Sequence, residues 1–327
     1  MNKININILK TYFTIIILGI FIFPGLSLAY QKTQLDIEFQ NDFVVEPGKT
    51  EIFLNKGESV VKNIIVTNRI RRRVGFRLST EDLVGTTDPS QPVILMGDTD
   101  GPYSLRDFIE PEIYEFILEP GERIIIPVKV SIPIDAEPRG YYGALIVSSE
   151  SDLDENDKEV SGAQGKTKII SRIGSLFLVK INGQGKEEGR LEDFKISGPL
   201  QKFYSSAPES FEIAYENTGN VHLVPYGKIS INNLIGRTVD QIAVDAYFVL
   251  PDSIRYREVF WQDAGFMLGR YKAELSLYKG YNNEYESAEV VFWVLPWKVV
   301  VPVLIGLVLL ISIVYYVLTR FEIKKKN

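Results

Sequence analysis

Two contrasting patterns of apolar and polar residues run along this chain. Over most of its length, short runs rich in Val, Ile, Phe and Tyr end at Gly, Pro, Asn or Asp, which is typical of β-strands and their turns. Near the C-terminus, the twenty residues of 299–318 carry no formal charge. The first pattern predicts an all-β region, and the second predicts one long apolar helix.

The β-rich region divides at Gly183-Gln184-Gly185 into two groups of expected strands. The first group covers 59–67, 74–79, 113–118, 123–132, 141–148 and 168–181. The second group covers 191–197, 210–216, 221–231, 238–248, 254–261, 267–278 and 286–294. Short strands at regular spacing, with no long helical pattern, predict an all-β fold of two tandem immunoglobulin-like β-sandwich domains at 30–185 and 186–296. Pro127 favours an edge position for the strand at 123–132.

Residues 297–319 have the length and composition of a transmembrane helix. At about 1.5 Å per residue, twenty helical residues span roughly 30 Å, the thickness of the hydrocarbon core of a bilayer. The aromatic residues suited to its two interfaces are Trp293 and Trp297 at one end and Tyr315 and Tyr316 at the other. The basic tail at 320–327 contains Arg320, Lys324, Lys325 and Lys326, which favour the cytoplasmic side. We therefore expect a single-pass type I protein of the cell membrane.

The N-terminal residues 1–29 have the layout of a signal peptide. Lys3 and Lys10 are basic, an apolar stretch follows, and Ser27-Leu28-Ala29 offers small residues for cleavage before Tyr30. An uncleaved anchor is the alternative. Both versions place residues 30–296 outside the cytoplasm.

Composition narrows the functional classes. The chain has 327 residues, of which 42 are acidic and 36 basic, and its net charge is −6. This balance gives no reason to expect a nucleic-acid partner, which would favour a basic domain. The absence of Cys excludes disulfides and thiolate zinc sites. A Cys-free exported protein fits a bacterial surface best.

The sequence offers no clear catalytic or metal site, so we expect a non-enzymatic protein without cofactor or metal. The single His, His222, has no Cys or second His for a metal pair, and a buried strand histidine is the favoured interpretation. The acidic stretch at 150–165 begins like a calcium loop, but Asp157 stands where Gly is required and Ala163 where Glu is required. A solvated loop is favoured there over a weak Ca²⁺ site. Two carboxylates for glycoside hydrolysis cannot be recognised from sequence, so an envelope hydrolase stays as a lesser alternative.

Two clusters could bind a partner. The first is the arginine cluster, which consists of Arg69, Arg71, Arg72, Arg73 and Arg77. A charged edge that blocks strand aggregation is the simpler interpretation, and a contact with an anionic wall polymer or an acidic protein is the functional one. The second is a tyrosine-bearing hairpin tip, which consists of Tyr278, Tyr281 and Tyr285 around Asn282-Asn283. A plain turn is the simpler interpretation there, and stacking on sugar or contact with lipid headgroups is the functional one.

Several stretches carry a family resemblance. They are LEPGERIIIPVKVSIPIDAEPRGYYGALIVSS in the first domain, and YENTGNVHLVPYGKISINNLIGRTV, VLPDSIRYREVFW and LGRYKAELSLYKG in the second. With the signal, helix and Lys-rich tail, they resemble the WxL-interacting proteins of Gram-positive bacteria. The resemblance implies a peptidoglycan-binding first domain and a second domain that binds a protein partner.

These observations together predict a membrane-anchored surface protein. Its two sandwiches would bind an envelope polymer or a secreted protein, with pairing of a partner strand at an exposed edge as one mode. The alternative is an accessory subunit of an envelope secretion or signalling complex, in which the helix packs against a larger assembly.

Overall fold

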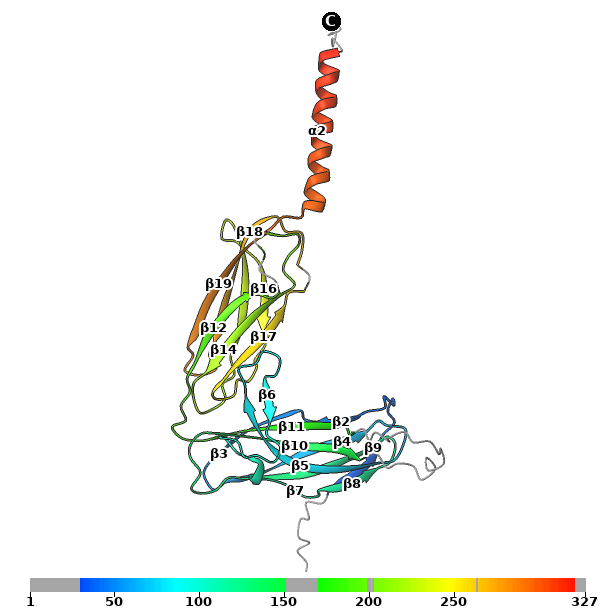
Figure 1. Ribbon diagram of the computed structural model, residues 1–327, viewed down its shortest axis with the longest axis vertical. Coiled ribbons are helices and arrows are strands. Elements are labelled where there is room, and N and C mark those ends of the chain that lie inside the picture. Colours follow the sequence, from blue (N-terminus) through cyan, green and yellow to red (C-terminus); the bar gives the residue numbers. More distant parts are fainter. Residues whose placement is uncertain (1–29, 151–169, 199–200, 202, 263, 321–327) are drawn as a thin grey trace, which may run out of the picture.

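A computed structural model describes residues 30–150, 170–198, 201, 203–262 and 264–320 of the chain. The expected signal peptide, the acidic stretch from 151 onward and Lys324, Lys325 and Lys326 lie outside these residues. The chain builds two β-sandwiches, here called domain 1 (strands between residues 31 and 181) and domain 2 (strands between 189 and 294), and then the helix α2 (Trp297–Arg320). Domain 1 lies across one end of domain 2, and α2 leaves the other end (Figure 1). The predicted β-sandwich architecture and apolar C-terminal helix are confirmed.

Domain 1 consists of two facing sheets. The first has the order β1 (Gln31–Gln34), β9 (Glu122–Ser131), β4 (Ser59–Asn68) and β2 (Phe43–Glu46), and β7 (Ile109–Pro111) also pairs with β9. The second has the order β3 (Lys49–Leu54), β11 (Arg172–Ile181), β10 (Gly140–Glu150), β5 (Val74–Gly85) and β6 (Val93–Leu95), and β8 (Glu115–Leu118) also pairs with β5. A 3-10 helix, η1 (Arg106–Phe108), precedes β7. Among the described strands of this domain, only β3 and β11 pair in parallel.

The prediction of an edge position for the Pro127 strand is wrong. That strand, β9, lies between β4 and the pair β1 and β7. β1 pairs with β9 at 122–125, and β7 pairs with it at 128–130. Pro127 therefore stands where one neighbour has ended and the next begins, so the missing N–H removes no ladder hydrogen bond.

Domain 2 also consists of two sheets. The smaller has the order β12 (Gly189–Ile196), β14 (Ser210–Asn217) and β17 (Ser253–Phe260). The larger has the order β13 (Phe203–Tyr204), β19 (Tyr285–Val294), β18 (Gly269–Tyr278), β15 (Tyr226–Asn233) and β16 (Thr238–Val244). Trp261 packs in the core beside Phe211 and Phe292, and its Nε1 donates to Asp240 Oδ2 at 2.7 Å.

The two domains share a packed junction. Strand β10 is apolar on both faces: Leu145 and Val147 enter the core of domain 1, whereas Ala144 and Ile146 join a second cluster that includes Leu250 of domain 2. Backbone hydrogen bonds cross the junction from Gly140 N to Asn220 O at 2.9 Å and from Ile254 N to Thr86 O at 3.1 Å. Strand β10 is therefore buried on both faces, and the face that carries Ala144 and Ile146 forms part of the contact between the domains.

His222 lies in this junction rather than in a strand. Its backbone N donates to the Tyr142 hydroxyl at 2.5 Å, and its Nδ1 lies 3.3 Å from the same oxygen. The side chain is buried, as expected. It lies in the segment from Val221 to Pro225, which precedes β15 and contacts domain 1. Burial lowers the pKa of the imidazole to about 4.

Candidate functional site

The arginine cluster is largely neutralised by its neighbours. Arg69 forms a two-pronged ion pair with Asp42 at 2.5 and 2.7 Å, Arg73 lies 3.6 Å from Glu119, and Arg77 lies 3.1 Å from Glu115. Arg71 lies over the ring of Phe39. The link from Arg69 to Arg73, which includes Arg72, is a bend between β4 and β5. These three ion pairs offset most of the positive charge of the cluster, and Arg71 and Arg72 supply what net charge it retains toward an anionic polymer.

A groove opens at one edge of domain 1, where the chain changes sheets. β7 belongs to the first sheet through β9, whereas β8, a few residues later, belongs to the second through β5. After the chain passes from the first sheet to the second, β8 lies beside β1. Each of these two is an edge strand of its own sheet. Strand β8 lies on the side of domain 1 that faces away from α2 (Figure 1).

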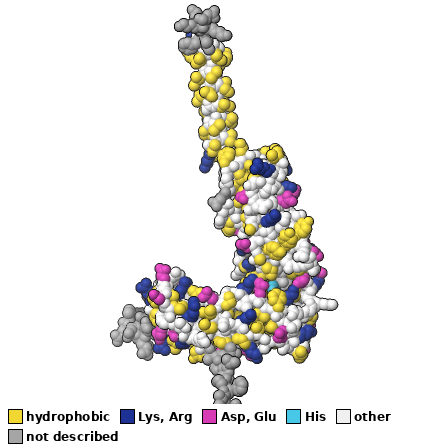
Figure 2. Space-filling view, turned by 180° about the vertical axis from the view of Figure 1, so that it is seen from behind, with side chains coloured by type: hydrophobic (Ala, Val, Ile, Leu, Met, Phe, Trp, Pro, Cys, Tyr) yellow, Lys and Arg dark blue, Asp and Glu magenta, His cyan; other side chains and the backbone are white. Residues whose placement is uncertain are grey.

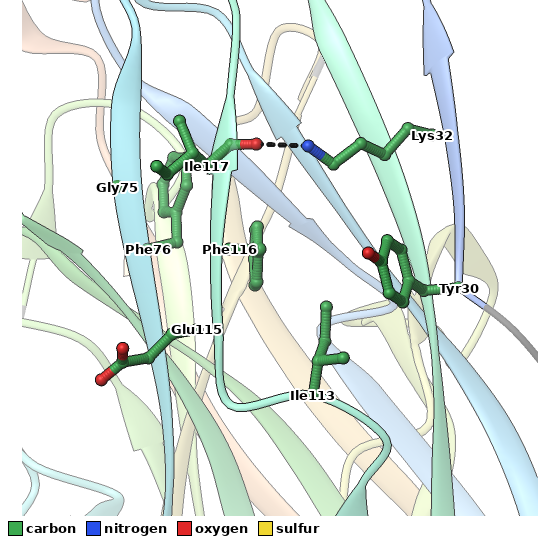
Figure 3. Close-up of a pocket in the computed structure, with 8 residues that line it drawn as sticks. All are labelled: Tyr30, Lys32, Gly75, Phe76, Ile113, Glu115, Phe116 and Ile117. Atoms are coloured by element: carbon green, nitrogen blue, oxygen red, sulfur yellow. Dashed lines mark hydrogen bonds between the residues drawn. The ribbon is translucent and has the colours of Figure 1, made fainter.

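The groove has a volume of about 410 Å³ and is lined by residues of β1, β5 and β8. Figure 3 shows Tyr30, Ile113 and Phe116 pointing into the space between the two edge strands. Phe116 stacks on Phe76 with ring centroids 5.4 Å apart, so the floor is continuous with the core. A floor of aromatic and aliphatic side chains suits an apolar ligand.

Polar groups at the rim of the groove guard the edge of β8. Lys32 Nζ donates to the carbonyl oxygen of Ile117 at 2.6 Å, as the dashed line in Figure 3 shows. The same Lys32 lies 3.8 Å from Glu122. A lysine on an exposed strand edge discourages pairing with other chains. An incoming strand must therefore displace the Lys32 ammonium before it can pair with β8.

Sequence reasoning missed this groove. All four residues of β1 are polar and exposed, so β1 has no apolar alternation to reveal it. In the sequence, Tyr30 stands out only as the residue after the expected cleavage site. The one available signal was the alternation of 113–118, which correctly located β8.

A second candidate surface is the tyrosine ladder, which we define as Tyr226, Tyr278 and Tyr285. These residues face one another across three adjacent strands, because Tyr226 pairs with Tyr278 and Tyr278 with Tyr285. The first two rings are stacked with centroids 5.4 Å apart, and the next two are 6.0 Å apart. The three side chains are 47, 42 and 65% exposed, so part of each ring stays accessible to a ligand.

The ladder differs from the predicted tyrosine tip in membership and place. Tyr281 turns inward, and its hydroxyl accepts a hydrogen bond from Gly189 N at 3.0 Å. Tyr226 takes its place, and Asn282 and Asn283 line a hollow of about 190 Å³ beside it. The hairpin lies at the domain 1 end of β19, and ten strand residues, roughly 30 Å, separate it from the α2 end. Sugar stacking therefore fits this place better than lipid contact.

The expected membrane-interface aromatics lie at both ends of α2. Trp293 and Trp297 are exposed next to its start, and Tyr315 and Tyr316 are exposed near Arg320 at its end. α2 is long and apolar enough to cross a membrane, and none of its residues is buried in the protein.

Within the described residues, no group of three or more His, Cys, Asp and Glu side chains is arranged to hold a metal ion.

No family model matches the sequence, and no curated protein matches it. Solved structures with tandem β-sandwiches are similar at low identity. The CsuC–CsuE chaperone and tip-adhesin complex of Acinetobacter baumannii is 12% identical with a TM-score of 0.36, over 76% of this chain and 97% of that one. The class 5 fimbriae chaperone CfaA is 11% identical with a TM-score of 0.35, over 78% and 100%. The Escherichia coli chaperone DraB is 10% identical with a TM-score of 0.33, over 76% and 97%.

Proposed function

We propose that this protein is a non-enzymatic, membrane-anchored binding protein whose domain 1 groove takes an extended segment of a surface or secreted protein. The observation that carries the proposal is the open edge between β1 and β8, with its apolar floor and polar rim. An accessory role in an envelope complex would use the same surface.

Binding would follow the geometry of a β-sheet. A partner segment that pairs with β8 displaces Lys32 from the Ile117 carbonyl and gains main-chain hydrogen bonds. Because strand side chains alternate between faces, every second residue of the segment would enter the space lined by Ile113, Phe116 and Tyr30. The groove therefore favours segments with alternating apolar and polar residues.

The anchor would present this groove away from the membrane. We propose that α2 spans the bilayer with residues 30–296 outside and the basic tail inside, as the positive-inside rule favours. The whole of domain 2 then stands between the groove and the lipid (Figure 1). An epitope tag at the C-terminus should be inaccessible to antibody on intact cells and accessible after permeabilisation; labelling of intact cells would contradict this orientation.

A peptide-binding experiment tests the groove. Full-length protein in nanodiscs is titrated with peptides of alternating apolar and polar residues, and with block-ordered peptides of the same composition. We expect binding of the alternating peptides alone. Ile117→Asp should weaken it by about tenfold or more, since roughly 1.4 kcal/mol of apolar contact and desolvation is lost.

The control for this variant lies on another edge of the same sheet. Ile94 on β6 is 42% exposed, and Ile117 is 40% exposed, so Ile94→Asp makes the same chemical change in a matched environment. It should leave the affinity within about twofold. Equal loss in both variants, or equal binding of alternating and block-ordered peptides, would contradict the groove.

The tyrosine ladder supports a second candidate function, which is recognition of an envelope glycan such as peptidoglycan. Three exposed rings in register offer apolar faces to a sugar chain, and Asn282 and Asn283 offer amides to its hydroxyls. Wall sacculi should pull down the full-length protein in detergent, in a manner that 0.5 M salt does not remove. The double variant Tyr226→Ala, Tyr278→Ala should abolish this, and Tyr114→Ala, an exposed tyrosine of domain 1, should not.

A further inference from the structure

Large exposed apolar side chains gather at the end of domain 2 from which α2 leaves. They come from two connections and one short strand that are distant in sequence, and strand register places all three at this end. The larger sheet fixes the direction: Val294, the last residue of β19, pairs with Gly269, the first residue of β18. The residues just before Gly269, Phe266 to Leu268, therefore lie near the start of α2.

The first connection is the hairpin between β15 and β16. Asn233, the last residue of β15, pairs with Tyr271, which pairs with Phe292 near the end of β19. The tip that follows, Leu234 and Ile235, thus reaches the level of the last residues of β19. These two side chains are 69 and 84% exposed, and Ile235 is the most exposed large apolar side chain of the described residues.

The second connection is the segment between β17 and β18. It exposes Phe266 by 72% and Leu268 by 51%, whereas Met267 between them is buried. Phe266 and Met267 line a hollow of about 350 Å³ together with Pro296, the residue before α2. The third group is Phe203 on β13, whose ring lies 6.2 Å from that of Trp293.

The link from domain 2 to α2 is short and hydrogen-bonded. Only Leu295 and Pro296 separate β19 from α2. Leu295 N donates to Tyr204 O at 2.7 Å, and Val299 N donates to Pro296 O at 2.9 Å. A span that enters the hydrocarbon near Val299 therefore holds the end of domain 2 within about 10 Å of it, at the level of the headgroups.

The charges at this end suit phosphate headgroups. Arg237 follows the hairpin tip, Arg270 pairs with Trp293, and Lys298 lies over the Trp297 ring. Two acidic residues also lie at this end: Asp240 accepts a hydrogen bond from Trp261 Nε1, and Glu209 lines the hollow beside Phe266. Figure 2 shows apolar and basic side chains together on the end of domain 2 that meets the helix.

We infer that this end of domain 2 is a membrane-docking surface, in which Leu234, Ile235, Phe266 and Leu268 enter the headgroup region of the outer leaflet. The inference rests on the proposed membrane span of α2. It adds a second, non-covalently held contact with the same bilayer, off the axis of the helix. Contact at both places fixes the tilt of the two sandwiches, and the groove is held away from the lipid surface.

Single-cysteine labelling tests the inference, because the chain has no Cys of its own. An environment-sensitive fluorophore is placed at Ile235 or Phe266 in the full-length protein, reconstituted in vesicles of phosphatidylcholine and phosphatidylglycerol. The control site is Ile134, which is 77% exposed and lies between β9 and β10 in domain 1. Domain 1 lies at the end of domain 2 opposite α2 (Figure 1). We expect a blue-shifted emission and quenching by lipid-borne quenchers at 235 and 266, but quenching by aqueous iodide at 134.

A flotation measurement on the same samples separates the two claims. Protein that floats with the vesicles at high pH, but whose probes at 235 and 266 behave like that at 134, overturns the docking surface and leaves the membrane span standing. Protein that fails to float overturns the span and the docking surface together. Replacing Ile235 and Phe266 by Ser should leave flotation unchanged and expose a probe at Leu268 to iodide; an unmoved probe would count against docking.

Discussion

At the scale of single residues, the contact of His222 with Tyr142 decides how the junction responds to pH. The imidazole is enclosed between the domains, and burial is the largest reason for its lowered pKa. The charged groups around it have mixed effects: Glu51 and Glu187 raise the pKa, and Lys49 and Lys180 lower it. Protonation would place a charge where water cannot solvate it.

We therefore predict a loss of stability as the pH falls from about 6.5 to 4. The folded pKa of His222 is about 4 against an ordinary value of 6.5. Between these pH values the His222 imidazole is protonated in the unfolded chain but neutral in the folded chain. Acid therefore favours unfolding by up to about 3 kcal/mol. Urea titrations of wild type and His222→Gln at pH 7 and pH 4.5 measure this. Between these two pH values the drop in the variant should be smaller than that of wild type by about 2 kcal/mol, and equal drops would contradict the assignment.

Two buried asparagines occupy corresponding places in the two domains. Asn68 is the last residue of β4, and Asn217 is the last residue of β14; both side chains are fully buried. Asn217 Nδ2 donates to Val221 O and Val249 O at 2.8 Å each, and its Oδ1 accepts from Gly219 N at 2.9 Å. Each asparagine closes the connection that follows its strand.

Asn217→Ala should cost about 2–4 kcal/mol of unfolding free energy, because buried carbonyl and N–H groups lose their partners. Chemical denaturation of the detergent-solubilised protein measures the cost. The control is Asn63→Ala on an exposed position of β4, where we expect a change within about 0.5 kcal/mol. Similar values for both variants would show that the hydrogen bonds of Asn217 contribute little.

At the scale of elements, one lysine controls access to the edge of β8. Lys32 occupies the Ile117 carbonyl with which an incoming strand would pair. Lys32→Met keeps the aliphatic stem of the side chain but removes the donor to Ile117 O. We predict tighter binding of alternating peptides, by about threefold to tenfold, and concentration-dependent self-association, because the edge of β8 is no longer guarded. Lys62→Met on the inner strand β4 is the control. Fluorescence anisotropy and analytical ultracentrifugation measure the two effects, and unchanged behaviour of Lys32→Met would argue against β8 as the pairing edge.

Most strands could be predicted from sequence because they alternate around a single core. The expected strands at 123–132, 210–216 and 286–294 match β9, β14 and β19 to within a residue or two. Six short strands, β1, β2, β3, β6, β7 and β13, were not predicted, because each has six residues or fewer and too little alternation to stand out. Two boundaries also differ next to the junction between the domains. β15 begins at Tyr226 rather than 221, and β16 ends at Val244 rather than 248, because the flanking segments carry His222 and Leu250 to domain 1.

The candidate sites were only partly within reach of sequence reasoning. The Tyr278–Tyr285 pair could be predicted because a hairpin brings its two strands together locally. Tyr226 could not, since its pairing with Tyr278 joins residues about fifty positions apart. Predicting the groove would have required the pairing of β1 with β9 and of β8 with β5. These strands are polar or short, and their sequences contain no pattern that identifies their partners.

At the scale of the whole molecule, the junction sets the angle between the sandwiches. Gly85 at the end of β5 packs against Ser253 and Leu250 of domain 2, and an added Cβ would lie 2.4 Å from Ser253 Cβ. No other residue fits between the domains at this point without moving them.

Gly85→Leu should therefore separate the domains and broaden their relative orientation. Spin labels at Ile134 and Ile235, one in each domain, report this as a wider distance distribution in pulsed electron paramagnetic resonance. Gly48→Leu is the matched control, because nothing lies within 4 Å of its added Cβ. An unchanged narrow distribution in Gly85→Leu would mean that the angle is set elsewhere.

The two-residue link after β19 has a mechanical consequence. If α2 spans the membrane and domain 1 holds a partner as proposed, tension between the two enters domain 2 at the start of β12 and leaves at the end of β19, at opposite ends of the sandwich. The pull then runs along the strands, across the hydrogen bonds that join β19 to β18 over all ten of its residues. Such a ladder is loaded in shear, so its bonds must fail together rather than one after another. Domain 2 is thereby suited to act as a tether that withstands drag on whatever the cell surface holds.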